Sequence, residues 1–199
     1  MRAIRLLALT MFCACLIAFA PSCSPIRAIT EPAGNGKKSV DDTIRQAQAE
    51  VAGGEYKKAL ELYSSAYEKN HAPEMRDNYS AAGEQIRKNA DTAYQRKDFA
   101  EAGSIYNTLI ESGISTRDFA NSLSFNGDYL NGQKNACSKA LLEAGLTIYR
   151  DGKLEDAISI WKKALVFDRD NKDIKSAIET ATTQLQNLKN IKQKNSLTP

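Results

Sequence analysis

The chain has 199 residues, of which 42% are hydrophobic and 26% are charged, a composition that excludes a wholly disordered protein. Its 27 Lys and Arg residues against 24 Asp and Glu residues give a net charge of +3, so no nucleic-acid partner is expected. A mean hydropathy of -0.45 excludes a polytopic membrane protein.

Residues 1–22 have the layout of a bacterial export signal. Arg2 and Arg5 precede an uncharged run over residues 6–20, which is shorter than the roughly 20 apolar residues of a membrane-spanning helix. The segment ends in Ala-Pro-Ser followed by Cys23. This ending resembles the lipobox of bacterial lipoproteins, in which the cysteine is lipidated and becomes the mature N-terminus. We therefore expect a lipoprotein-type signal peptide and a lipid on Cys23.

Two alternatives to lipidation stay open: an uncleaved anchor and ordinary secretion. Ala18 and Ala20 fit the small-residue rule of ordinary signal peptidase. Cleavage there would leave Pro21 as the first mature residue, which that enzyme tolerates badly. The residue after Cys23 is Ser24 and not an aspartate. In enteric-type lipoproteins this pattern goes with the outer membrane, so the resemblance implies that membrane if Cys23 is lipidated. The expected location is the bacterial cell envelope, anchored by lipid to the outer membrane and facing the periplasm.

A flexible tether is expected next, over residues 23–39, because this stretch contains prolines and glycines at Pro25, Pro32, Gly34 and Gly36. The folded domain is expected over residues 40–199. No proline lies between Pro73 and Pro199, and alanine, the strongest helix former, is abundant. This pattern predicts an almost wholly helical domain.

One pattern recurs three times in this domain: an alanine, an aromatic residue four positions later, and a small or apolar residue three positions after that. The copies are Ala59-Tyr63-Ala66, Ala102-Tyr106-Leu109 and Ala157-Trp161-Ala164. Each copy follows a turn-like stretch, over residues 53–55, 96–98 and 151–153. An alanine lets two antiparallel helices approach closely, and the aromatic residue fills the gap to the next pair. The pattern resembles the second half of a tetratricopeptide repeat (TPR).

The resemblance implies an all-α fold: an irregular TPR-like solenoid of helical hairpins with inserted helices and a C-terminal capping helix. The repeats would span about residues 40–70, 83–112 and 138–171, and the capping helix residues 172–192. The three alanines are 43 and 55 residues apart, whereas tight TPR arrays repeat every 34.

The two excesses in spacing predict a lengthened helix over residues 74–95 and an extra helix near residues 116–125. A further helix is expected to run from there to Arg150. Helix starts are also marked, because three N-cap residues each precede an acidic residue by three positions. These pairs are Ser39 with Asp42, Asp98 with Glu101, and Asp170 with Asp173.

The sequence offers no catalytic, metal or cofactor motif. His71 is its single histidine, so a two-histidine zinc site cannot form. Neither a G-x-S-x-G nor an H-E-x-x-H motif is present. We therefore expect no enzyme activity, no metal and no cofactor.

TPR proteins bind other proteins through the concave face that the first helix of each pair lines. Carried over to this chain, the resemblance gives a partner-binding groove of Arg87, Tyr94, Leu142, Leu146 and Tyr149. The last three residues fit equally well as packing against the inserted helix. An apolar or amphipathic segment of another envelope protein would suit this groove.

Two functions follow from these expectations. The first is a lipid-anchored adaptor or scaffold that mediates protein–protein interaction in the bacterial cell envelope. The alternative is a periplasmic solute-binding protein, in which the inserted helices close a pocket over a small apolar ligand.

Overall fold

The computed structural model describes residues 34–197, so the predicted signal peptide, Cys23 and most of the predicted tether lie outside the described residues. Within that range the chain is all-α, as predicted, and contains no strand. The α-helices are α1 (Gly34–Ala52), α2 (Tyr56–Asn70), α3 (Pro73–Gln95), α4 (Phe99–Glu111), α5 (Gly127–Arg150), α6 (Leu154–Leu165) and α7 (Lys172–Leu197). Two short 3-10 helices, η1 (Ile114–Thr116) and η2 (Ala120–Ser122), lie between α4 and α5.

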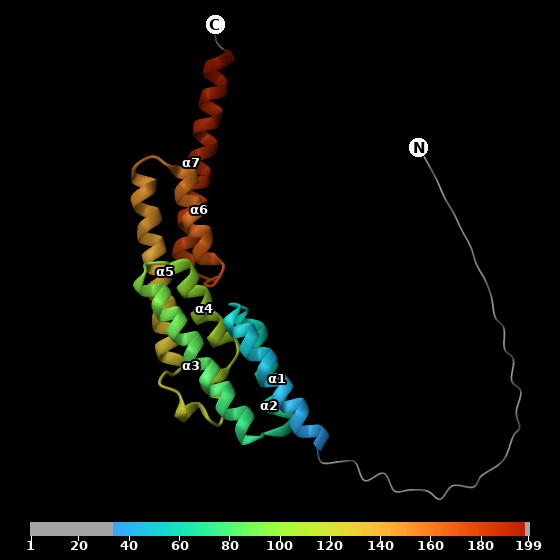
Figure 1. Ribbon diagram of the computed structural model, residues 1–199. Coiled ribbons are helices and arrows are strands. Elements are labelled where there is room, and N and C mark those ends of the chain that lie inside the picture. Colours follow the sequence, from blue (N-terminus) through green and yellow to red (C-terminus); the bar gives the residue numbers. More distant parts are fainter. Residues whose placement is uncertain (1–33, 198–199) are drawn as a thin grey trace, which may run out of the picture. The chain divides into compact units, whose positions relative to one another are not determined.

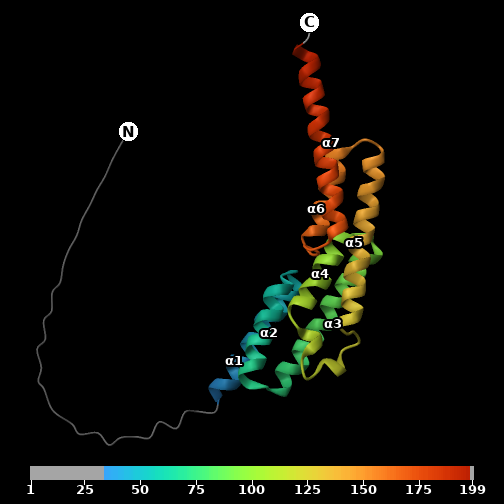
Figure 2. The ribbon, with the colours of Figure 1, turned by 180° about the vertical axis from the view of Figure 1, so that it is seen from behind.

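Consecutive helices form three pairs: α1 with α2, α3 with α4, and α5 with α6 (Figure 1). The second helix of each pair also packs against the helix that follows it, so α2 contacts α3, α4 contacts α5, and α6 contacts α7. The reverse view shows the same order (Figure 2). Each helix therefore covers the apolar faces of its neighbours in the chain.

The three loops inside the pairs share one turn geometry. The middle residue of each loop has a positive φ: 82° at Gly54, 63° at Lys97 and 77° at Gly152. The next residue, which is Glu55, Asp98 or Lys153, donates its N–H to the carbonyl oxygen five positions earlier. The three N···O distances are 2.9, 2.9 and 3.2 Å, in that order. This is the hydrogen bond that closes a Schellman turn at a helix C-terminus. The three stretches that the sequence marked as turns are therefore equivalent in structure.

The recurring alanine and aromatic residues form the core. All three alanines of the pattern are fully buried, and the aromatic residues Tyr63, Tyr106 and Trp161 are each 1% exposed. Glycines allow the closest approaches: a Cβ on Gly103 would lie 2.4 Å from Phe167, and one on Gly145 would lie 2.1 Å from Nε1 of Trp161. The α4 and α5 backbones are thus in direct contact with aromatic rings from α6 and from the residues that follow it.

The lengthened helix is confirmed, since α3 spans Pro73–Gln95, but the extra helix predicted near residues 116–125 is wrong. That stretch contains η2 and the end of η1, joined by irregular backbone. The buried residues between α4 and α5 are Ile114, Phe119 and Phe125, which are five and six positions apart, a spacing that does not fit one face of an α-helix. The helix that follows ends at Arg150, as predicted.

The predicted N-caps have three different outcomes. Asp98 is confirmed, because its side chain accepts a hydrogen bond from the N–H of Glu101 at 3.2 Å. Ser39 is wrong: α1 begins at Gly34, so the last residues assigned to the tether are helical. No proline lies between residues 33 and 39 to stop this helix from extending towards the N-terminus. At α7 the cap is Asn171 instead of Asp170, since its Oδ1 accepts from the N–H of Ile174 at 3.1 Å.

Candidate functional site

The predicted groove residues fall into two groups on different helices. Arg87 and Tyr94 lie on α3, whereas Leu142, Leu146 and Tyr149 lie on α5. Between these two helices stands α4, which packs against both. The sixth predicted site residue, Cys23, lies outside the described residues.

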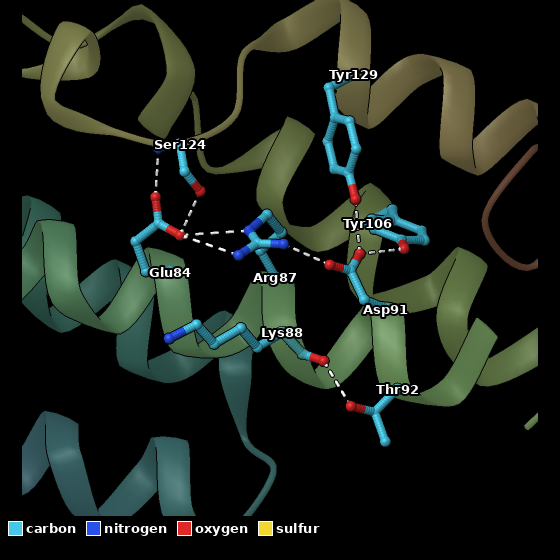
Figure 3. A network of polar contacts seen from close by, with 8 residues as sticks. All are labelled: Glu84, Arg87, Lys88, Asp91, Thr92, Tyr106, Ser124 and Tyr129. Carbon is cyan, nitrogen blue, oxygen red and sulfur yellow. Dashed lines mark hydrogen bonds and ion pairs between the residues drawn. The ribbon is translucent and has the colours of Figure 1, made fainter. Parts of the chain in front are cut away.

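Arg87 is held in a network of charged and phenolic side chains (Figure 3). Its Nη1 pairs with Oδ2 of Asp91, and its Nε and Nη2 donate to Oε2 of Glu84 at 3.3 Å each. The other carboxylate oxygen of Asp91 accepts from Tyr106 at 2.6 Å and from Tyr129 at 2.8 Å. Burial opposes the charge of Arg87, but Asp91 and Glu84 outweigh it and raise the pKa of the guanidinium.

Glu84 extends the network to the irregular segment before α5. It accepts from the backbone N–H of Ser124 and, at 2.7 Å, from its hydroxyl. Burial alone would raise the pKa of Glu84, yet the bonds from Ser124 and Arg87 lower it. Burial and the bond to Asp91 raise the pKa of Tyr106 far above its ordinary value. The network therefore joins α3, α4, α5 and this segment. The positive charge of Arg87 is already balanced by Glu84 and Asp91 inside the molecule.

The other groove residues are also engaged inside the molecule. The ring of Tyr94 lies edge-on to Phe99, with centroids 5.3 Å apart, at the turn between α3 and α4. The carbonyl of Leu142 accepts from Nε1 of Trp161 at 3.0 Å. Tyr149 lies 6.0 Å from the Trp161 ring and donates to Oε1 of Gln184 on α7 at 2.6 Å. Leu146 is partly buried against the core. Leu142 and Tyr149 thus contact α6 and α7, and the inserted helix that was predicted beside them does not form.

A cleft of about 250 Å³ lies between α2 and α4, where the sequence predicted no site. It is lined by Lys57, Leu60, Glu61, Ser64, Ser65, Thr108, Glu111 and Ser112, so hydroxyl groups and charges of both signs surround a single leucine. None of the predicted groove residues lines it. No sequence motif could have marked this cleft, because its two walls lie more than 40 residues apart in the chain.

A buried tyrosine hydroxyl lies close to this cleft. Tyr79 is fully buried, and among the described residues its Oη has no hydrogen-bond partner. Burial raises the pKa of Tyr79, while Arg117 and the hydroxyls of Ser64 and Ser112 act in the opposite direction. Arg117 itself donates to Ser64 and, at 2.9 Å, to Glu68. Buried polar groups are usually paired with protein or ordered water, so this hydroxyl is the expected place of a bound water.

The C-terminal half of α7 presents an uncovered apolar surface. In its N-terminal half Ile174 and Ala181 are fully buried. Further along, Leu188 is 45% and Ile191 is 54% exposed. Figures 1 and 2 both show this part of α7 extending past the loop between α5 and α6. The sequence predicted a capping helix here, but it does not reveal where the helices that cover it end.

The described part of the chain contains no group of three or more His, Cys, Asp or Glu side chains that could hold a metal ion. His71 ends α2 with a φ of 46°, and its ring lies edge-on to Tyr67 at 5.0 Å. None of the helices over residues 34–197 combines the length and the apolar character needed to span a membrane.

A comparison with models of known protein families gives no match, and a comparison with curated proteins gives none either.

Proposed function

We propose that this protein is a lipid-anchored, TPR-like adaptor that mediates protein–protein interaction in the bacterial cell envelope. The observation that carries the proposal is the apolar surface of α7, where Leu188 continues the buried side of the helix and Ile191 lies beside it, and these two side chains are 45% and 54% exposed. Large exposed apolar side chains that line up with a packing seam are typical of an interaction site.

Two features support the TPR-like architecture within this proposal. The three recurring motifs bury their alanine and aromatic residues in the same way. The three hairpin turns share a central residue with positive φ and the same closing hydrogen bond. Repetition of both core and turn is what an array of related helical hairpins requires.

The anchor would hold the domain near the membrane. If Cys23 carries lipid, ten residues separate it from α1, which begins at Gly34. At about 3.3–3.6 Å per residue, that segment spans at most about 36 Å. A connection this short would keep α1 close to the bilayer surface, whereas the C-terminal half of α7 lies at the other end of the row of helices (Figure 1).

The solute-binding alternative has less support. The segment that would close its pocket forms two 3-10 helices, and two of its polar side chains, Arg117 and Ser124, are bonded to α2 and α3. The hollow that this segment lines measures about 370 Å³, and the cleft between α2 and α4 measures about 250 Å³. None of the predicted groove residues lines either of them.

Crosslinked capture of the full chain from native membranes tests the adaptor proposal. We expect Leu188→Lys with Ile191→Lys to lose proteins that the wild type captures, while keeping the helical circular dichroism signal and the melting temperature. Thr183→Lys is the matched control, because Thr183 is exposed on the opposite side of α7. The proposal is wrong if the wild type captures no specific protein, and its anchor is wrong if Cys23→Ala retains an acyl label.

A further inference from the structure

The packing seam of α7 is longer than the helices that cover it. Ile174, Ile178, Ala181, Leu185 and Leu188 follow one another at alternating spacings of four and three residues, so they share one face. Ile174 and Ala181 are buried, and Ile178 is partly buried against the core. At 1.5 Å per residue, α7 is about 39 Å long and α6 about 18 Å. The face that α6 covers therefore continues without a covering helix among residues 34–197.

The uncovered part has the length and shape to take one more helix. From Leu185 to Asn195 the helix makes about three turns, or roughly 16 Å. Leu188 and Ile191 stand on this part with about half of their surface exposed. Because α6 already packs along the first half of the same face, a helix from outside would extend an existing helix–helix seam.

The charges beside the face indicate the chemistry of that helix. After Glu179, the rest of the chain contains no Asp or Glu, but it contains Lys189, Lys192 and Lys194. Lys189 follows Leu185 by four positions and borders the apolar face, whereas Lys192 follows Leu188 by four positions and lies on the same face, one turn further along. A second copy of the chain would place its own lysines beside these lysines, and the like charges would repel. A lipid surface fits less well, because Leu185, Leu188 and Ile191 make a short apolar face for membrane insertion.

We infer that the C-terminal half of α7 binds an amphipathic helix of another protein, in which Asp or Glu residues flank an apolar stripe. Leu185, Leu188 and Ile191 pack against that stripe, and Lys189 at its edge and Lys192 at its C-terminal end pair with the acidic residues. The inference rests on the proposed adaptor function and names the chemistry of its partner.

Photo-crosslinking in native cells tests the inference with the full chain. A photo-reactive amino acid replaces Leu188 in one variant and Thr183, on the opposite side of α7, in another. We expect crosslinks from position 188 and few from position 183. The crosslinked peptide, identified by mass spectrometry, should be a helical segment of a different protein with acidic residues beside its apolar positions.

Charge reversal supplies the second readout. We expect Lys189→Glu with Lys192→Glu to lower the crosslink yield from position 188 by on the order of tenfold. Lys162→Glu with Lys163→Glu is the matched control, because both residues are exposed on α6 and change the net charge equally. This control should leave the yield within about twofold of the wild type, and circular dichroism should show that both variants stay folded.

The outcomes separate the inference from the function on which it rests. Crosslinks from position 188 to a second copy, to lipid, or to a segment without flanking acids overturn the inference, as does a yield insensitive to charge reversal. Partner crosslinks from Tyr94 or Leu146 but none from position 188 also overturn it, while leaving the adaptor function standing. An absence of protein crosslinks from all of these positions overturns both.

Discussion

Single residues set how closely the helices of a pair approach. On the inner side of α5, Gly145 leaves the space that the indole of Trp161 fills, and Trp161 is 1% exposed. The indole N–H is satisfied by the carbonyl of Leu142 at 3.0 Å, so the tryptophan is fixed by both shape and hydrogen bonding. The sequence motif predicted that Trp161 would be buried, because the aromatic position recurs in every copy.

The first prediction uses two glycines of the same helix. Gly145→Ala should lower the free energy of unfolding by about 1–3 kcal/mol, since its Cβ would lie 2.1 Å from Trp161 Nε1. Gly132→Ala, the matched control, should raise it by about 0.5–1 kcal/mol, because nothing lies within 4 Å and alanine favours the helix. Urea unfolding followed by circular dichroism measures both. Equal effects at the two sites would show that α5 and α6 are not in close contact at Gly145.

The thiol of Cys137 gives a second prediction. Cys137 is fully buried, and burial raises the pKa of its thiol to about 12. At pH 8 only about one molecule in ten thousand would then carry the thiolate, the reactive form. We expect a disulfide reagent to leave the folded protein unmodified and to modify Cys137 rapidly in urea. Rapid modification of the native protein would mean that α5 opens at this position.

The same reaction with a disulfide reagent also tests lipidation at Cys23. A mature chain that begins at lipidated Cys23 keeps one free thiol, whereas the full sequence contains four cysteines. The Cys137→Ala variant of the membrane-extracted protein should therefore show no free thiol even in urea. Additional thiols would contradict lipidation at Cys23.

The ion pairs of Arg87 were not predicted from the sequence. It was expected in a groove because of its helical position, but its charge is used by Glu84 and Asp91, three residues before it and four after it. That spacing was visible in the sequence and is the spacing of intrahelical ion pairs. The bonds from Tyr106 and Tyr129 to Asp91 depend on how α4 and α5 pack, which no local pattern reports.

At the scale of elements, the hairpin turns were predictable and the segment between α4 and α5 was not. The turns contain glycine or a polar residue where a left-handed conformation is needed. In the segment, Arg117 donates to Glu68, 49 residues away, and Ser124 to Glu84, 40 residues away. These long-range bonds, together with buried Phe119, stabilise irregular backbone in place of a helix. A prediction from spacing alone counts the extra residues but does not give their conformation.

Lys97 gives a third prediction, because it occupies the turn position that is glycine in the other two hairpins. Its φ of 63° is unfavourable for a residue with a Cβ. Lys97→Gly should therefore raise the free energy of unfolding by about 0.5–1 kcal/mol. Lys88→Gly, the same substitution inside α3, should lower it by about 1 kcal/mol. Urea melts of the two variants and the wild type decide; destabilisation by Lys97→Gly would mean that this turn is not equivalent to the others.

At the scale of the whole domain, the order of the long helices followed from sequence, apart from the extra helix near residues 116–125, because no proline lies between Pro73 and Pro199 and the apolar residues recur at helical spacing. The sequence could not show which part of the last helix is covered. The apolar stripe of α7 looks alike from Ile174 to Leu188, and only the short length of α6 leaves its second half exposed. The candidate site therefore came from the lengths of neighbouring elements, a property of the assembled fold.

Two truncations of α7 make the last prediction. A chain that ends at residue 186 loses Leu188 and Ile191, which are about half exposed, so its free energy of unfolding should fall by at most about 1–2 kcal/mol. A chain that ends at residue 171 also loses Ile174 and Ala181, both fully buried, and uncovers the α6 face beneath them. Because burial of one isoleucine contributes about 1.5–3 kcal/mol, the second truncation should cost at least about 3 kcal/mol in total.

Urea melts and partner capture on the same two chains separate stability from binding. We expect the first truncation to stay folded with only this small loss of stability and to lose its partner, since the uncovered apolar surface is gone. The second should lose both. If the truncation at residue 186 destabilises the domain as much as the one at residue 171, residues 187–197 belong to the folded core and are not a free binding surface. If it stays stable and still captures its partner, binding occurs elsewhere on the domain.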